Sequence, residues 1–61
     1  MSLDTAIRCF KENIMVIQNA YGSPPTYDTP LDMKIAWRLN TGLVNLAESL
    51  ARVEEALQHQ R

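Results

Sequence analysis

The sequence predicts an all-α fold, an antiparallel helical hairpin that assembles as a four-helix-bundle-type homodimer. Two long segments carry apolar residues at helical spacing, and a short segment that holds all three prolines separates them. Neither long segment alternates with the period of two that is typical of strands. With 61 residues, the chain is expected to form one domain over residues 1–61.

The first helix is expected over about residues 3–20. Ser2 or Asp4 can cap its N-terminus, and Gly22 stands where a residue with positive φ would end the helix. Its apolar seam follows alternating spacings of four and three residues, through Leu3, Ile7, Phe10, Ile14, Ile17 and Tyr21.

The loop is expected over residues 21–29, because prolines remove backbone donors and push the residues before them toward extended conformations. Its segment Pro24-Pro25-Thr26-Tyr27 matches the Pro-Pro-x-Tyr pattern that WW domains bind. We interpret the segment as a stiff connection, with Tyr27 as a lid on the open end of the bundle. A recognition motif is the alternative.

The second helix is expected over about residues 30–59, with a length of about 45 Å at 1.5 Å per residue. Thr29 stands at the N-cap position and Pro30 at the first helical position, and Asp32 resembles the acidic half of a capping box. The leucine-rich seam of this helix runs through Ala36, Leu39, Leu43, Leu46, Leu50, Val53 and Leu57.

The unequal lengths of the two helices predict an assembly. In an antiparallel hairpin, residue i of the first helix should lie near residue 51 minus i of the second, give or take a turn. Ile14 then meets Trp37, and Leu3 meets the neighbourhood of Glu48. The seam beyond Glu48 has nothing from its own chain to cover it, so it needs another chain.

The apolar arc of the second helix is also wider than one neighbour can cover. Met33, Trp37, Val44, Ala47 and Ala51 flank the seam on one side, and Ile35, Gly42, Ser49 and Ala56 flank it on the other. The expected homodimer interface consists of Leu43, Leu46, Leu50, Val53, Leu57, Gly42, Ser49 and Ala56. A two-fold dimer is the commonest closure, and a tetramer is the alternative.

Charge and composition exclude several function classes. Six Lys and Arg against seven Asp and Glu give a formal net charge of -1, which creates no general attraction to nucleic acid or anionic lipid. The longest apolar run, Ile14 to Ile17, is far too short for a membrane span, and the N-terminus does not resemble a signal peptide. We therefore expect a cytoplasmic protein.

Catalysis and cofactor binding are not expected. A nucleophile needs a base within hydrogen-bond reach and a group that orients that base, but Cys9 and His59 lie on different predicted helices and His59 falls in a helix end expected to fray. One cysteine and one histidine also fall short of the four ligands of a structural zinc site. Cys9 is expected on the surface without a role, and a metal or redox role is the alternative.

The expected function is a small regulatory module that dimerises and binds another macromolecule, namely a protein. Cys9, Met15 and Val16 add apolar surface away from the seam of the first helix, which either the dimer buries or a protein partner contacts. The alternative is an RNA- or DNA-binding dimer whose basic residues gather toward the loop: Arg8, Lys11, Lys34 and Arg38. Trp37 and Tyr21 are expected in the core, with their polar atoms at the wet end of the bundle.

Overall fold

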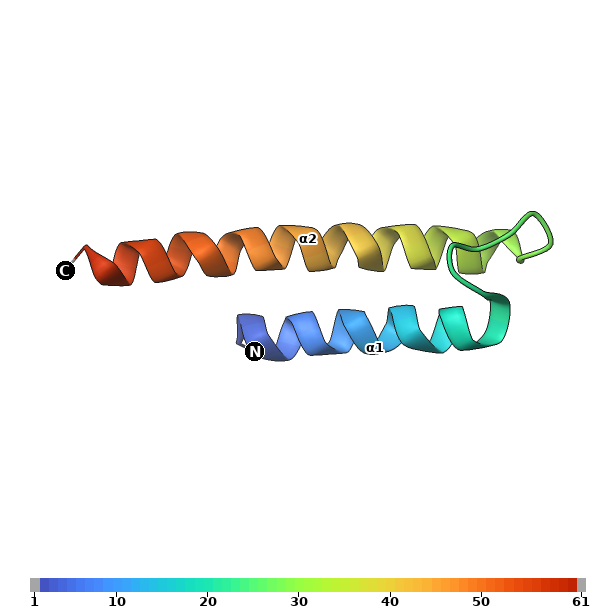
Figure 1. The fold of residues 1–61 in the computed structure, drawn as a ribbon, viewed down its shortest axis with the longest axis horizontal. Coiled ribbons are helices and arrows are strands. Elements are labelled where there is room, and N and C mark those ends of the chain that lie inside the picture. The colour runs from blue at the N-terminus through green and yellow to red at the C-terminus, as the bar shows by residue number, and fades with distance from the viewer. Residues whose placement is uncertain (1, 61) are drawn as a thin grey trace.

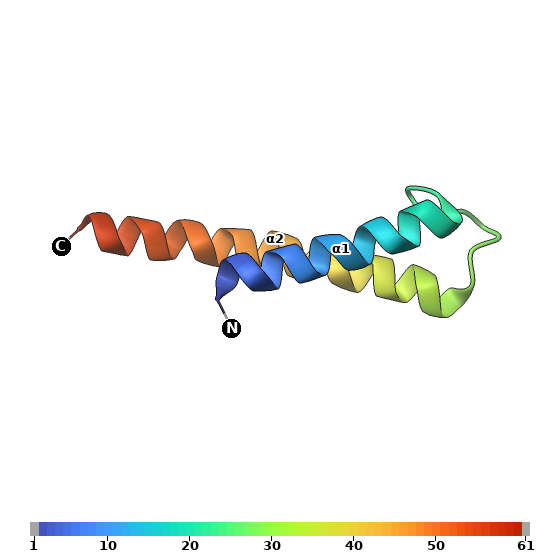
Figure 2. The same cartoon turned by 90° about the horizontal axis from the view of Figure 1, so that it is seen from below.

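The computed structural model describes residues 2–60 as two antiparallel helices joined by one loop (Figure 1). Helix α1 spans Leu3–Tyr21 and helix α2 spans Leu31–His59. The all-helical hairpin is therefore confirmed, and both helices begin and end within one residue of the expected positions. Viewed from below, the helices cross at a shallow angle (Figure 2). The molecule is a rod, with extents of 51 × 16 × 15 Å.

Helix α1 has well-defined ends. Its N-cap is Ser2, whose Oγ accepts a 3.1 Å hydrogen bond from the Thr5 N–H. Its C-terminus is closed by Gly22, whose N–H donates to the Gln18 carbonyl at 2.8 Å. Gly22 has a φ of 94°, a backbone angle that side-chain-bearing residues rarely adopt.

The start of α2 differs from the expected capping box. The N-cap is Pro30, whose carbonyl accepts from the Met33 and Lys34 N–H groups at 3.0 Å. Thr29 is buried in the loop instead, where its Oγ1 accepts from the Thr26 N–H at 3.0 Å. The prediction for Thr29 was wrong because a threonine hydroxyl can close a turn as readily as it caps a helix. The Asp32 carboxylate accepts from the adjacent Met33 N–H and completes no box.

The seam of α1 faces α2, as predicted. Ile17 is buried, and Leu3, Ile7, Phe10 and Ile14 are half-buried along the same side. Tyr21, at the loop end of this seam, is 40% exposed. Period and burial therefore agree from Leu3 to Ile17, whereas Tyr21, which was expected in the core, is exposed because it lies at the open loop end of the helix pair.

On α2, the side that packs against α1 consists of the residues that were expected beside the leucine-rich seam, and not of the seam itself. Val44 and Ala47 are buried, and Met33, Trp37 and Ala51 are half-buried along that side. Because Ala47 and Ala51 are small, they let the two helices approach closely. The leucine-rich seam therefore does not form the core of the hairpin, contrary to the prediction.

The register lies within about a turn of the predicted one. Asn13 Nδ2 donates a 3.0 Å hydrogen bond to Asn40 Oδ1 across the helix pair. Leu3 lies beside Ala51 and Glu54, slightly past the expected Glu48. Beyond this point α2 extends alone, as Figure 1 shows.

Candidate interaction surface

An apolar row runs along the side of α2 that α1 does not cover. We call it the α2 stripe, and it consists of Leu39, Leu43, Leu46, Leu50, Val53 and Leu57. Leu43 is half-buried, and the exposed fractions of the other five range from 49% at Leu50 to 60% at Leu39. Leu31 and Ile35, in the first turns of α2, are exposed as well. A single hairpin thus presents most of its leucines to water.

Helical geometry explains why both sides of α2 are apolar. Val44 is buried against α1, and Leu46, two residues later, points about 200° away around the helix. Leu43 and Leu50, however, point only about 40° and 60° away from the buried Ala47, so the stripe is centred about 120° around the helix from the α1-facing side. A helix that is apolar on two sides needs two neighbours, and the hairpin supplies one.

The other residues of the expected dimer interface lie along the stripe and are also exposed: Gly42, Ser49 and Ala56. A side chain at Gly42 would meet nothing within 4 Å in the single chain. Ser49 is turned back on its own helix, since its Oγ donates to the Asn45 carbonyl at 2.9 Å. These small residues leave room beside the leucines for another helix to approach.

On α1, the three residues singled out by the sequence are all at the surface. Cys9 is a free, exposed thiol, as expected. Met15 is 60% exposed and Val16 is 68% exposed. The single chain therefore leaves this apolar area uncovered.

The basic residues do not gather at the loop end. Lys11 lies 3.7 Å from the Glu48 carboxylate, whereas Lys34 donates to the Tyr27 carbonyl at 3.2 Å and lies 5.6 Å from the centre of the Tyr27 ring. Glu48 is fourteen residues from Lys34, which is about 21 Å along α2. Arg8 and Arg38 are exposed. The single chain thus does not form the expected cluster of bases, because the Lys11 side chain reaches away from the loop to Glu48.

The loop holds its shape through Thr29 but does not cover the bundle end. Tyr27 is 94% exposed, so the prediction that its ring forms a lid was wrong. The backbone nearby is a closed turn, in which the Thr29 N–H donates to the Thr26 carbonyl at 3.1 Å. A WW-domain ligand is instead extended, so the folded loop does not present Pro24-Pro25-Thr26-Tyr27 in the bound form.

Trp37 faces α1 and is half-buried, but its polar atom does not reach the wet end of the bundle. Its Nε1 is buried without a hydrogen-bond partner among residues 2–60. The expectation for the indole was therefore wrong. Its position on the α1-facing side directs the ring between the helices, and the backbone groups there are already engaged within the helices.

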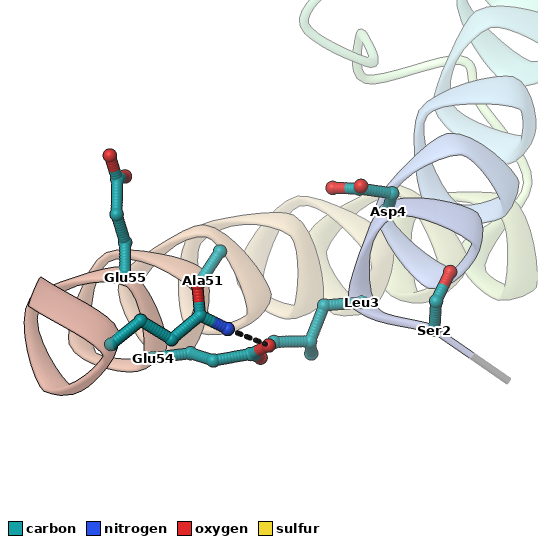
Figure 3. A pocket seen from close by; sticks show the side chains of 7 residues that line it. Ser2, Leu3, Asp4, Ala51, Glu54 and Glu55 are labelled. Carbon is teal, nitrogen blue, oxygen red and sulfur yellow. Dashed lines mark hydrogen bonds between the residues drawn. The ribbon is translucent and has the colours of Figure 1, made fainter. Parts of the chain in front are cut away.

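A shallow hollow lies where the N-terminus of α1 meets the overhang of α2. Its volume is about 260 Å³, and its lining consists of Ser2, Leu3, Asp4, Ala51, Glu54, Glu55 and Gln58. Figure 3 shows the Glu54 side chain extending along α2 toward Leu3, with Gln58 Nε2 donating to its Oε1 at 3.4 Å. Among the described residues, no group of three or more His, Cys, Asp or Glu side chains is arranged to hold a metal ion.

Cys9 and His59 are far apart along the rod. His59 lies in the last turn of α2, with Nε2 3.7 Å from the Glu55 carboxylate. Cys9 lies on α1 four residues from Asn13, which marks the level of Asn40 on α2. The two side chains are thus held on separate helices at different levels.

Neither of the two helices is long and apolar enough to cross a lipid bilayer. Comparisons with protein-family models, with curated proteins and with solved structures give no match for this chain.

Proposed function

We propose that this chain is a small, non-enzymatic, cytoplasmic interaction module that forms a four-helix-bundle-type homodimer through the α2 stripe and binds another protein. The observation that carries the proposal is the exposure of the stripe from Leu39 to Leu57, where only Leu43 is half-buried. Soluble monomers rarely leave an apolar row of this length in water, and such rows mark interaction sites.

The surface area supports association. The chain exposes 4834 Å² at a mass of 6.9 kDa. A compact monomer of that mass exposes about 4,000 Å², so roughly 800 Å² is surplus. A typical stable interface buries about 800 Å² per partner, which matches the surplus.

The sparse core supports the same proposal. Ile17, Val44 and Ala47 are the buried hydrophobic residues among those described, and no large side chain is fully buried. A domain of this size is only marginally stable on its own core, and small domains often gain stability from a disulfide, a metal or association. A second hairpin packed on the stripe would supply the missing burial.

Solution mass tests this proposal. Light scattering on a sizing column across a hundredfold dilution is expected to give twice the 6.9 kDa of one chain. Leu50→Asp should raise the dissociation constant of the dimer at least about a hundredfold, because it places an unpaired charge in an apolar interface. Asn19→Asp is the matched control, since it adds the same charge at an exposed position on α1, away from the α2 stripe. A wild-type monomer that remains helical would refute the homodimer, and a fourfold mass would indicate a tetramer.

Nucleic acid is the second candidate, and the single chain supports it less. Lys11 is paired with Glu48, and Lys34 is held by Tyr27, so two of the four candidate bases are already engaged. Phosphate binding weakens log-linearly with salt, whereas an apolar contact does not. Titrations of a labelled RNA duplex and a labelled DNA duplex at two salt concentrations would reveal such binding directly.

A further inference from the structure

Among residues 2–60, two polar side-chain contacts link the helices, and they lie on opposite faces of the hairpin. Asn13 is bonded to Asn40 at 3.0 Å, and Lys11 lies 3.7 Å from Glu48. Asn13 follows Lys11 by two residues, which places their side chains about 200° apart around α1. We name the two sides of the hairpin the asparagine face and the charged face.

The asparagine face is apolar on both helices. On α1, Cys9 and Val16 lie four residues before and three residues after Asn13, so they share its side of the helix. On α2, Leu43 lies three residues after Asn40 and leads directly into the α2 stripe. Ala6 and Ala20 lie one heptad before and after Asn13, and their small side chains leave room for a neighbouring helix on this side of α1. The exposed apolar residues of α1 and the α2 stripe therefore lie on the same face of the hairpin, with the Asn13–Asn40 pair between them.

The charged face differs in composition. Arg8 and Met15 lie three residues before and four residues after Lys11, so Met15 belongs to this face. On α2, Arg52 follows Glu48 by four residues and also lies there. Met15 and Val16 are neighbours in the chain and similarly exposed, but they belong to opposite faces of the hairpin.

We infer that a second copy of this chain covers the asparagine face across both helices, and not the α2 stripe alone. Cys9, Asn13 and Val16 then lie in the dimer interface, while Lys11 and Met15 stay in solvent. This inference rests on the proposed homodimer and specifies which part of α1 joins it.

The surface area and the charge of the asparagine face indicate that a second copy of the chain covers it. The surplus of roughly 800 Å² is what one partner contributes to a stable dimer. The side chains that define the asparagine face are uncharged, and the charged residues on the same side of α2, Asp32 and Glu54, lie toward the two ends of the helix. The middle of the face therefore fits an apolar counterpart. The same face on a second copy is such a counterpart and has the same length. The Asn13–Asn40 bond becomes buried there, and a buried asparagine in a helical interface is known to fix register.

A matched pair of variants tests the inference. In the single chain Val16 is 68% exposed and Met15 60% exposed, so a glutamate at either position would be tolerated equally by a monomer. By sedimentation equilibrium, Val16→Glu is expected to weaken the dimer at least about tenfold, and Met15→Glu less than about threefold. Equal effects of the two variants, or a Val16→Glu dimer as tight as wild type, would overturn it. Circular dichroism checks folding: loss of helix in Val16→Glu alone also supports the inference.

The wild-type thiol supplies a second measurement that needs no substitution. Cys9 should react with a maleimide at least about tenfold more slowly in a concentrated dimer than after dilution to monomer, because the interface excludes the reagent. An unchanged rate would overturn the inference. A wild-type monomer at all concentrations would refute the proposed homodimer itself. A wild-type dimer with a reactive Cys9 and a tolerant Val16 would keep the homodimer and confine its interface to α2.

Discussion

Asn13 and Asn40 join the two helices through their side-chain amides, with Asn13 Nδ2 donating to Asn40 Oδ1 at 3.0 Å. Asn40 Nδ2 in turn donates to the Ala36 carbonyl, four residues earlier on α2, at 2.7 Å. The second bond fixes the orientation of the Asn40 amide, so its oxygen points at α1. The pair therefore links the two helices at one level of the hairpin.

Removing either amide should therefore lower the free energy of unfolding. Removing both should cost less than the sum of the two single losses. In a double-mutant cycle with Asn13→Ala and Asn40→Ala, we expect a coupling of about 0.5–1.5 kcal/mol in the free energy of unfolding. Urea unfolding followed by circular dichroism at one fixed chain concentration measures it. Asn19→Ala is the control for helix propensity, since Asn19 is exposed on the same helix. Additive losses would mean that the bond does not couple the helices.

Thr29 should matter through its hydroxyl. Thr29→Val removes the acceptor of the Thr26 N–H in a buried site, which is expected to cost about 1–3 kcal/mol of unfolding free energy. Thr29→Ser keeps the acceptor and loses one methyl group, at a cost of about 0.8 kcal/mol. Thermal unfolding of the two variants compares them. If valine is tolerated better than serine, the hydrogen bond does not hold the loop.

The sequence predicted both helices and the buried side of α1, but it misassigned the side of α2 that meets α1. Apolar periodicity identifies the most hydrophobic side of a helix, and on α2 that side is the stripe. The sequence analysis placed Val44 and Ala47 beside the seam. It could not show that this side, and not the seam, packs against α1. That choice depends on how closely two helices can approach, which is a property of the packed pair and not of either segment.

The loop residues were predicted less well, for a related reason. Thr29 and Tyr27 can each take two roles with the same local sequence: a threonine can cap a helix or close a turn, and an aromatic ring can cover a core or remain in water. Long-range packing decides between the roles. The Asn13–Asn40 bond was not predicted, although its two residues lie close to the predicted antiparallel register, and asparagines opposed across that register were the available signal.

Tyr27 should be dispensable for folding. Since its side chain is 94% exposed, Tyr27→Ala should change the free energy of unfolding by less than about 0.5 kcal/mol. Tyr21→Ala, at the end of the α1 seam, should cost more, because part of its ring is withdrawn from water. Urea unfolding of both variants tests the comparison. A larger loss for Tyr27→Ala would show that the ring covers apolar surface in the assembled protein.

The charged face should contribute little to stability or to association. The side chains of Lys11 and Glu48 are 57% and 41% exposed, so water and salt screen their attraction. Glu48→Gln should therefore change the free energy of unfolding by less than about 0.5 kcal/mol. The dimer dissociation constant of the wild-type chain should vary less than about threefold between 50 and 500 mM NaCl, because the interface proposed above is apolar. Sedimentation equilibrium at the two salt concentrations measures this dependence. A dimer that weakens tenfold or more in high salt would place charged residues in the interface, contrary to the apolar interface proposed above.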